Sequence, residues 1–155
     1  DIVNYIKKEM NLAIGETTAE QIKMEIGCAL PLMTDMSMEI RGRDLSTGLP
    51  KNIIITSSQI EEAMQESVSK IVEIVKQTLE RTPPELGVDM IQNGIYLTGG
   101  SSQLKNLDQM IANKTGISVV KDDDPEQCIA RGLCRVINER EFRSLTFTTK
   151  EQEYN

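Results

Sequence analysis

A short apolar run turns on two glycines into a polar segment at Ile95-Tyr96-Leu97-Thr98-Gly99-Gly100-Ser101-Ser102. Apolar residues at helical spacing follow from Ser102 to Lys114, and Gly116 stands where a helix commonly ends. Residues 117–120 form a second apolar run. Asp124-Pro125 is typical of a helix start, and the apolar residues of this last helix, Ile129, Leu133, Val136 and Ile137, are expected to face inward. Strand and helix therefore alternate, which predicts an α/β fold with parallel strands.

The region before this unit has a different organisation. Thr17-Thr18-Ala19-Glu20 has the form of a capping box and predicts a helix that ends near Pro31. Residues 36–41 alternate between apolar and polar side chains, and residues 51–56 are rich in isoleucine. These two runs predict a β-hairpin.

The longest helix is predicted from the capping box Ser58-Gln59-Ile60-Glu61 to Pro83-Pro84, which ends it. We therefore expect a small subdomain of helices and a hairpin over 1–67, and an α/β subdomain over 68–155. Two short parallel strands make a thin sheet, so the second part lacks strands that would complete it.

Composition excludes several classes of function. The 155 residues include 17 basic and 24 acidic side chains, and the net charge of −7 disfavours nucleic acid as a partner. Histidine is absent, which excludes Ser-His-Asp and Cys-His catalysis and His-ligated metals within this chain. No catalytic or metal-ligating group is predicted. The three cysteines form no CxxC pair and indicate a reducing cytosol, with Cys128 and Cys134 expected as small buried apolar residues.

The glycine turn is the first candidate site. A strand that turns on Gly99-Gly100 into a helix places backbone N–H groups around a concavity, which attracts phosphate. The alternative is a simple strand-to-helix turn in which Ser101 or Ser102 caps the helix. Neither the G-x-G-x-x-G spacing nor a Walker lysine is present.

Glu20 and Lys23 are the second candidate site, three positions apart in the first turn of a predicted helix. The glutamate could accept a hydrogen bond from a ribose hydroxyl, and the lysine could contact a base or a phosphate. In the alternative interpretation Glu20 closes the capping box and forms a solvated ion pair with Lys23.

Two other groups have structural interpretations. The run Asp122-Asp123-Asp124 is interpreted as a solvated loop before a helix cap rather than as a cation site. A cluster of methionines is interpreted as core filling rather than as an adaptable binding surface; it consists of Met24, Met33, Met36 and Met38.

Several longer motifs together resemble the MreB/Mbl family of bacterial actin homologues. They are Gly15-Glu16-Thr17-Thr18-Ala19-Glu20-Gln21-Ile22-Lys23-Met24-Glu25-Ile26-Gly27, Arg41-Gly42-Arg43-Asp44-Leu45-Ser46-Thr47-Gly48-Leu49-Pro50 and Leu79-Glu80-Arg81-Thr82-Pro83-Pro84-Glu85-Leu86. Leu97-Thr98-Gly99-Gly100, followed by Asp124-Pro125, completes the series in family order. The resemblance covers nearly all of residues 1–140.

The resemblance implies an actin-like α/β fold, of the ribonuclease H-like superfold, and polymerisation into filaments that depends on ATP, with Mg²⁺ in the full-length protein. Such filaments lie in the cytoplasm against the inner membrane, and they guide wall synthesis and cell shape together with the cell-elongation machinery. The stretch matching Glu20, Gln21, Ile22 and Lys23 contacts the nucleoside. The turn matching Gly99, Gly100, Ser101 and Ser102 lies against the adenosine and its phosphates, although the family usually has a third glycine at position 101.

The resemblance also implies that this chain is the second lobe only, truncated, with 1–67 as an inserted α+β subdomain. In the family the first phosphate loop and the catalytic residues precede the point where this chain begins, so the chain alone is expected not to hydrolyse ATP. An exposed sheet edge is expected to make it dimerise or exchange segments.

Two alternatives remain open at this stage. One is a lobe of a sugar kinase or an Hsp70-like ATPase, which share the strand and glycine turn. The other is an interaction module that binds no nucleotide.

Overall fold

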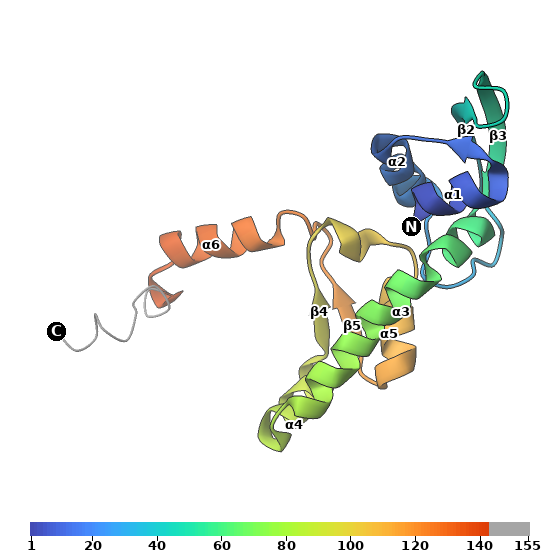
Figure 1. The fold of residues 1–155 in the computed structure, drawn as a ribbon. Helices are drawn as coiled ribbons and strands as arrows, with labels where there is room; N and C mark the ends of the chain where they lie inside the picture. The colour runs from blue at the N-terminus through green and yellow to red at the C-terminus, as the bar shows by residue number, and fades with distance from the viewer. Residues whose placement is uncertain (143–155) are drawn as a thin grey trace.

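The computed structural model describes residues 1–142, whose elements follow one another along a bent, elongated arrangement (Figure 1). In chain order they are α1 (Ile2–Met10), β1 (Leu12–Ala13), α2 (Glu16–Ile26), β2 (Ser37–Asp44), β3 (Pro50–Thr56), α3 (Ser57–Arg81), α4 (Pro84–Asn93), β4 (Ile95–Leu97), the 3₁₀ helix η1 (Gly100–Gln103), α5 (Leu107–Thr115), β5 (Val119–Lys121) and α6 (Cys128–Asn138). Phe142 is the last described residue, and the apolar residues Leu145 and Phe147 lie outside this range.

The predicted hairpin is confirmed as β2 and β3, which pair antiparallel in the register Ile40 with Ile53 and Met38 with Ile55. Ile40 and Ile55 are buried and face the helices. The sequence did not predict β1, which adds a third strand through Leu12 opposite Asp44. This short strand was missed because two residues carry no periodicity.

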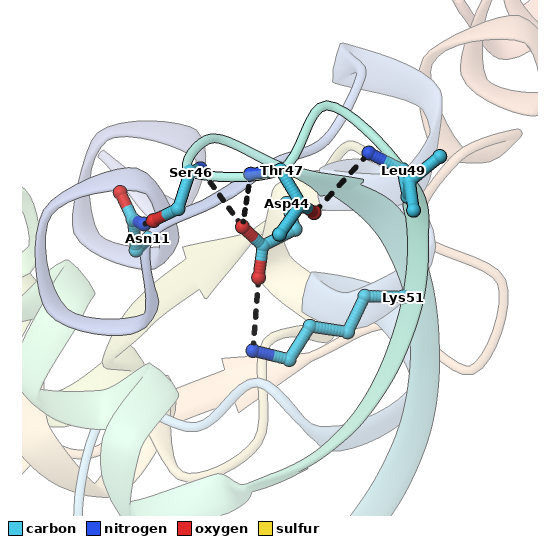
Figure 2. A network of polar contacts seen from close by, with 6 residues as sticks. All are labelled: Asn11, Asp44, Ser46, Thr47, Leu49 and Lys51. Carbon is cyan, nitrogen blue, oxygen red and sulfur yellow. Dashed lines mark hydrogen bonds and ion pairs between the residues drawn. The ribbon is translucent and has the colours of Figure 1, made fainter.

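The turn of the hairpin is organised by Asp44 (Figure 2). Its Oδ1 accepts hydrogen bonds from the backbone N–H groups of Ser46 (2.8 Å) and Thr47 (3.1 Å), and its Oδ2 lies 3.1 Å from Lys51 Nζ. The lysine and the two N–H donors lower the pKa of the Asp44 carboxyl from its usual value. The Asp44 N–H donates to the Leu49 carbonyl at 2.9 Å, which closes the turn.

The first helices begin and end elsewhere than predicted. Gly15 precedes α2 in an extended conformation without a side-chain cap, so the predicted capping box from Thr17 to Glu20 is wrong. The helix ends at Ile26 rather than near Pro31, because the following residues leave it to pair with another segment. The capping box of α3 lies at Thr56 and Gln59, two residues before the predicted one.

The long helix α3 ends before the proline pair as predicted, and α4 follows it. One side of α3 faces the core through Ile60, Met64, Val68 and Val72. The same core contains residues of α1, α2, β2 and β3 as well as Leu107, Met110 and Ile111 of α5. The predicted division at 67/68 falls within α3, and the two subdomains stay a prediction.

The parallel pair is confirmed, with Ile95 of β4 opposite Val119 of β5. The helix predicted from Ser102 to Lys114 is instead two helices, η1 and α5. Asn106 adopts a left-handed conformation (φ 61°) between them, while its neighbour Lys105 forms a parallel bridge with Cys28. This tertiary pairing interrupts the helix.

The start and the packing of α6 also differ from the prediction. It begins at Cys128 rather than at Asp124-Pro125, because the Pro125 carbonyl accepts a hydrogen bond from Gly99 N–H at 2.7 Å. Its apolar side is exposed rather than buried (Ile129 66%, Leu133 59%, Ile137 72%), since α6 extends away from the rest of the described chain (Figure 1).

Two further packing predictions are corrected. Cys134 is exposed and Cys128 half-buried, because both lie on α6, whereas Cys28 is buried. The methionines are mostly not core residues: Met24 and Met33 are exposed at 70% and 107%, Met36 is exposed, and Met38 is half-buried. Isoleucines fill the core in their place.

Candidate functional site

A hollow of about 860 Å³ lies where α1, α2, α3 and η1 meet. Its volume is within the range of pockets that hold small molecules. The lining combines charged, polar and apolar side chains and consists of Asp1, Ile2, Val3, Asn4, Glu16, Ala19, Glu20, Lys23, Met24, Met64, Ser67, Val68, Ile71, Gly100, Ser101, Gln103, Leu104, Leu107 and Glu126.

Both candidate sites of the sequence contribute to this one hollow. Glu20 and Lys23 line it from α2, and Gly100 and Ser101 line it from η1. These residues are far apart in the sequence, and the fold brings them to the same hollow. The two patterns therefore border the same hollow.

The other four predicted residues do not line the hollow. Ile22 is fully buried in the core, and Gln21 lies on the outer face of α2, where its amide donates to Glu25 at 3.0 Å. Gly99 and Ser102 do not reach the hollow, and the hydrogen bond between them stabilises the turn that carries Gly100 and Ser101.

Glu20 and Lys23 form an ion pair, with 2.8 Å between Oε1 and Nζ. The side chains remain accessible, 59% exposed for the glutamate and 33% for the lysine. The solvated pair of the alternative interpretation is thus present. A ligand that uses either group must compete with the other, and exposed pairs of this kind contribute little stability.

The glycine turn has a conformation that requires glycine. Gly99 has φ 82° and ψ 163°, a region in which residues with a side chain are strained. The Ser102 side chain donates from Oγ to the Gly99 carbonyl at 2.7 Å, and its backbone N–H donates to the same oxygen at 3.1 Å. Ser102, which is buried (4% exposed), therefore stabilises the conformation of the turn through these two hydrogen bonds.

The loop between β5 and α6 supports the turn from the other side. Glu126 Oε1 accepts a hydrogen bond from Gln103 Nε2 at 3.0 Å. A Cβ on Gly100 would lie 3.3 Å from the same Glu126 oxygen, so the absence of a side chain lets the loop approach closely. Both Gln103 and Glu126 line the hollow.

The two walls are joined beside the hollow by backbone pairing. Ala29 N–H donates to the Lys105 carbonyl at 2.8 Å, within the bridge between Cys28 and Lys105. Asn106 Nδ2 also lies 3.5 Å from the Leu30 carbonyl. The segment after α2 is thereby held against the segment after η1.

Sequence reasoning missed several lining residues. Asp1 and the first turn of α1 contribute four of them, and Met64, Val68 and Ile71 come from α3, whose apolar spacing indicated only a core face. Glu126 directly follows the family motif Asp124-Pro125, and this position is the only feature of the sequence that could have indicated its place in the lining. No feature of the sequence indicated the position of Gln103, which donates a hydrogen bond to Glu126.

The acidic run after β5 is a self-contained loop. Asp122 accepts hydrogen bonds from Asp124 N–H at 2.8 Å and from the Arg131 guanidinium, and the two donors lower the pKa of its carboxyl. Among residues 1–142 there is no group of three or more carboxylate or thiol ligands that could hold a metal ion. No helix in this range is long and apolar enough to cross a membrane.

Solved structures with this arrangement are actin-like. MreB5 of Spiroplasma citri bound to AMPPNP superimposes with a TM-score of 0.84 at 35% identity, over 94% of this chain and 43% of that chain. The ADP-bound form of the same protein superimposes with a TM-score of 0.85 at 33% identity. The MamK double helical filament has the same fold, with a TM-score of 0.70 at 20% identity. This chain thus has an actin-like fold, as the sequence predicted.

The sequence comparisons narrow the class to a family. The profile of the MreB/Mbl protein family matches residues 1–144. The cell shape-determining protein Mbl of Bacillus subtilis is 46% identical over 132 residues, which are 85% of this chain and 40% of that protein. The cell shape-determining protein MreB of Escherichia coli K12 is 45% identical over 131 residues, 84% of this chain and 38% of that protein.

The chain belongs to the MreB/Mbl family, and it spans about 40% of the length of these relatives. This membership confirms the resemblance seen in the motifs. It decides against the alternative of a sugar kinase or an Hsp70-like lobe.

Proposed function

We propose that this chain forms the nucleoside-facing part of an actin-like protein that binds ATP, polymerises and determines cell shape. Glu20 and Lys23 contact the nucleoside from α2. The turn from Gly99 to Ser102 contacts it from the other wall and reaches the phosphates with the backbone of Gly100 and Ser101. Ile22 anchors α2 in the core behind these contacts, and Gln21 lies on the outer face of the same helix.

The observation that carries this proposal is the convergence of Glu20, Lys23, Gly100 and Ser101 on one hollow. The solved relatives that resemble this chain bind AMPPNP and ADP, which supports a nucleotide as the ligand. The residues suit such a ligand: a carboxylate accepts from hydroxyl groups, and a glycine backbone permits close approach. When bound, ATP with Mg²⁺ supplies the phosphoanhydride that hydrolysis consumes, and the residues of this chain hold and orient its nucleoside.

Self-association is the second part of the proposal. Among the described residues β4 and β5 form a two-stranded sheet with open edges, and such edges pair with further strands. The MamK structure is a filament, which supports assembly for this fold. In the cell we place the filaments in the cytoplasm against the inner membrane, with the cell-elongation machinery, through the full-length protein.

Titration of the 155-residue chain with a fluorescent ATP analogue tests the binding proposal. We expect saturable binding that Lys23→Ala weakens at least fivefold and that Gly99→Val abolishes. Lys8→Ala is the control, because Lys8 also forms a short-range ion pair, with Glu9 (3.0 Å), but lies outside the hollow. Circular dichroism must show that each variant remains folded. If the folded wild-type chain binds no nucleotide, the proposal is wrong and the interaction module becomes the better explanation.

A further inference from the structure

The strand β3 forms an open edge of the three-stranded sheet. The strand order is β1-β2-β3, so within residues 1–142 β3 pairs with a strand on one side only. Asn52 is exposed, and Ile54 is 70% exposed. An edge of this kind presents backbone N–H and C=O groups that can pair with another strand.

The hydrogen-bonding register shows which backbone groups of β3 are free. The Ser57 N–H donates to the Met36 carbonyl at 2.8 Å, in continuation of the β2–β3 register. Bonded pairs alternate with non-bonded pairs along an antiparallel ladder, so every second residue back from Ser57 is bonded to β2. The N–H and C=O groups of Asn52 and Ile54 fall between these positions and therefore point away from β2.

The free stretch is short because both of its ends are blocked. Pro50, at the start of β3, has no N–H to donate. At the other end the Thr56 N–H donates to Gln59 Oε1 at 3.0 Å, within the capping box of α3. Asn52 and Ile54 are thus the two residues of β3 that offer both a donor and an acceptor to a further strand.

This stretch is complementary to itself. If a second copy pairs antiparallel about a two-fold axis beside Ile53, Asn52 of each chain lies opposite Ile54 of the other, and each donor meets an acceptor. The half-buried Ile53 side chains then lie side by side on the inner face of the sheet. On the outer face Glu39 and Arg41 flank Ile54 and Asn52 from β2, so the pairing brings no like charges opposite one another.

We infer that β3 is an interaction surface for a second copy of this chain, and that two residues of each chain join the two sheets through four backbone hydrogen bonds. An interface with a two-fold axis is closed, so it yields a dimer rather than a longer array. The contact is separate from the open edges of β4 and β5 and requires no nucleotide. Four exposed hydrogen bonds make a weak contact, with a Kd of about 0.1–1 mM.

The experiments use a common background that removes other routes to association. It replaces the two thiols and the apolar side of α6, with the substitutions Cys128→Ser, Cys134→Ser, Leu133→Glu and Ile137→Glu in the 155-residue chain. No nucleotide is added.

Disulfide cross-linking of Ile53→Cys tests the register. Cα atoms that face one another in a non-bonded antiparallel pair are about 4.5 Å apart, which a disulfide can span. With the chain at about 0.5 mM, near the expected Kd, we expect a disulfide-linked dimer to form about tenfold faster with Ile53→Cys than with Thr47→Cys, because pairing raises the effective concentration of the thiols. Thr47 is the control because it is exposed in the turn and lies outside β3.

Asn52→Pro tests the hydrogen bonds. Proline removes an N–H that β2 does not use, so it deletes two of the four intermolecular bonds and retains the ladder with β2. Asn52→Ala is the matched control, because both variants lose the side-chain hydrogen bond to Glu39 (3.4 Å) and only proline loses the N–H. Sedimentation equilibrium should show dimerisation that Asn52→Pro weakens about tenfold and that Asn52→Ala leaves nearly unchanged.

Either experiment can overturn the inference. If Ile53→Cys cross-links no faster than Thr47→Cys, or if folded Asn52→Pro dimerises as readily as Asn52→Ala, a second copy does not pair with this edge. If circular dichroism shows that Asn52→Pro is unfolded, the cross-linking comparison decides alone. A mass that keeps rising beyond the dimer would also overturn the inference, because the interface is closed. Failure here leaves the proposed function standing, since nucleotide binding is not involved.

Discussion

Lys105 Nζ donates a hydrogen bond to the Glu25 carbonyl across 2.6 Å and also lies 3.5 Å from the Met24 carbonyl. These two carbonyl groups belong to the last turn of α2, which carries Glu20 and Lys23. A cation at the C-terminal end of a helix satisfies carbonyl groups that have no partner within the helix. Lys105 thus connects one wall of the hollow to the other.

Lys105→Met should loosen this connection. The substitution retains most of the side-chain volume but removes the donor, and we expect the free energy of unfolding to fall by about 1 kcal/mol. Nucleoside binding should weaken several-fold, since the walls lose their fixed spacing. Chemical denaturation and nucleoside titration measure the two effects. Lys121→Met on the exposed side of β5 is the control, and an equal loss in that variant would contradict a specific role for Lys105.

Gly99→Ala should destabilise the chain by about 1–3 kcal/mol, because φ 82° with ψ 163° is a conformation that side chains disfavour. No atom lies within 4 Å of the added Cβ, so the cost is conformational rather than steric. Gly87→Ala provides the opposite case: it lies inside α4 with open space around it, and alanine should stabilise by up to about 1 kcal/mol. Urea denaturation of both variants should show changes of opposite sign. A neutral Gly99→Ala would contradict the assigned backbone requirement.

The parts of the fold that could be predicted are those with local causes. The hairpin β2–β3 follows from alternating side chains, the end of α3 from Pro83-Pro84, and the parallel pair β4–β5 from apolar runs around the glycine turn. The convergence of Glu20 and Lys23 with Gly100 and Ser101 was implied by the resemblance to the family. It could not be derived from either pattern alone.

Several of the predictions that were wrong share a physical cause, which is pairing with residues distant in sequence. Residues after Ile26 leave the helix to pair with Lys105, and the same contact separates η1 from α5. Likewise, the Ser57 hydroxyl accepts a hydrogen bond from the Met36 N–H and donates one to Asp35. The N-cap of α3 is Thr56 rather than the predicted Ser58. Local propensity cannot indicate such contacts.

Asp44→Asn should lower the melting temperature at pH 7, because the ion pair with Lys51 is lost at the turn shown in Figure 2. Since the pKa of Asp44 is lowered in the folded state, its contribution to stability is present above the unfolded pKa of about 3.9. That contribution is lost as the pH falls through the lower folded value. Thermal unfolding between pH 7 and pH 3 should therefore show the difference between variant and wild type shrinking below about pH 4. Asp89→Asn, at an exposed position of α4, serves as the control. A difference that stays constant with pH would contradict the role of the carboxylate.

Tyr5→Phe should remove the link between α1 and α3. Tyr5 Oη donates to Glu62 Oε2 at 2.8 Å, and its loss should cost about 1–2 kcal/mol. Burial, reinforced by the bond to Glu62, raises the pKa of Tyr5 from 10.0 to about 12. Its contribution to stability is therefore complete below pH 10 and is lost as the pH rises from 10 towards 12. Ultraviolet titration of tyrosinate should show a late transition that disappears in Tyr5→Phe and persists in Tyr96→Phe. A late transition that survives in Tyr5→Phe would show that another group causes it.

The exposed side of α6 should drive association between copies of the chain. Three large aliphatic side chains, Ile129, Leu133 and Ile137, are at least 59% exposed, and contiguous apolar surface of this kind is covered in stable proteins. We expect light scattering to show a mass that rises above the 17.3 kDa of the monomer as the concentration increases. The double variant Leu133→Glu/Ile137→Glu should shift this rise to at least tenfold higher concentration, because each carboxylate would have to be buried. Asn138→Glu adds a carboxylate outside the apolar stripe and should leave the rise in place. If the double variant associates as readily as the wild type, the open edges of β4 and β5 become the better explanation. A wild-type chain that stays monomeric at every concentration would count against both surfaces.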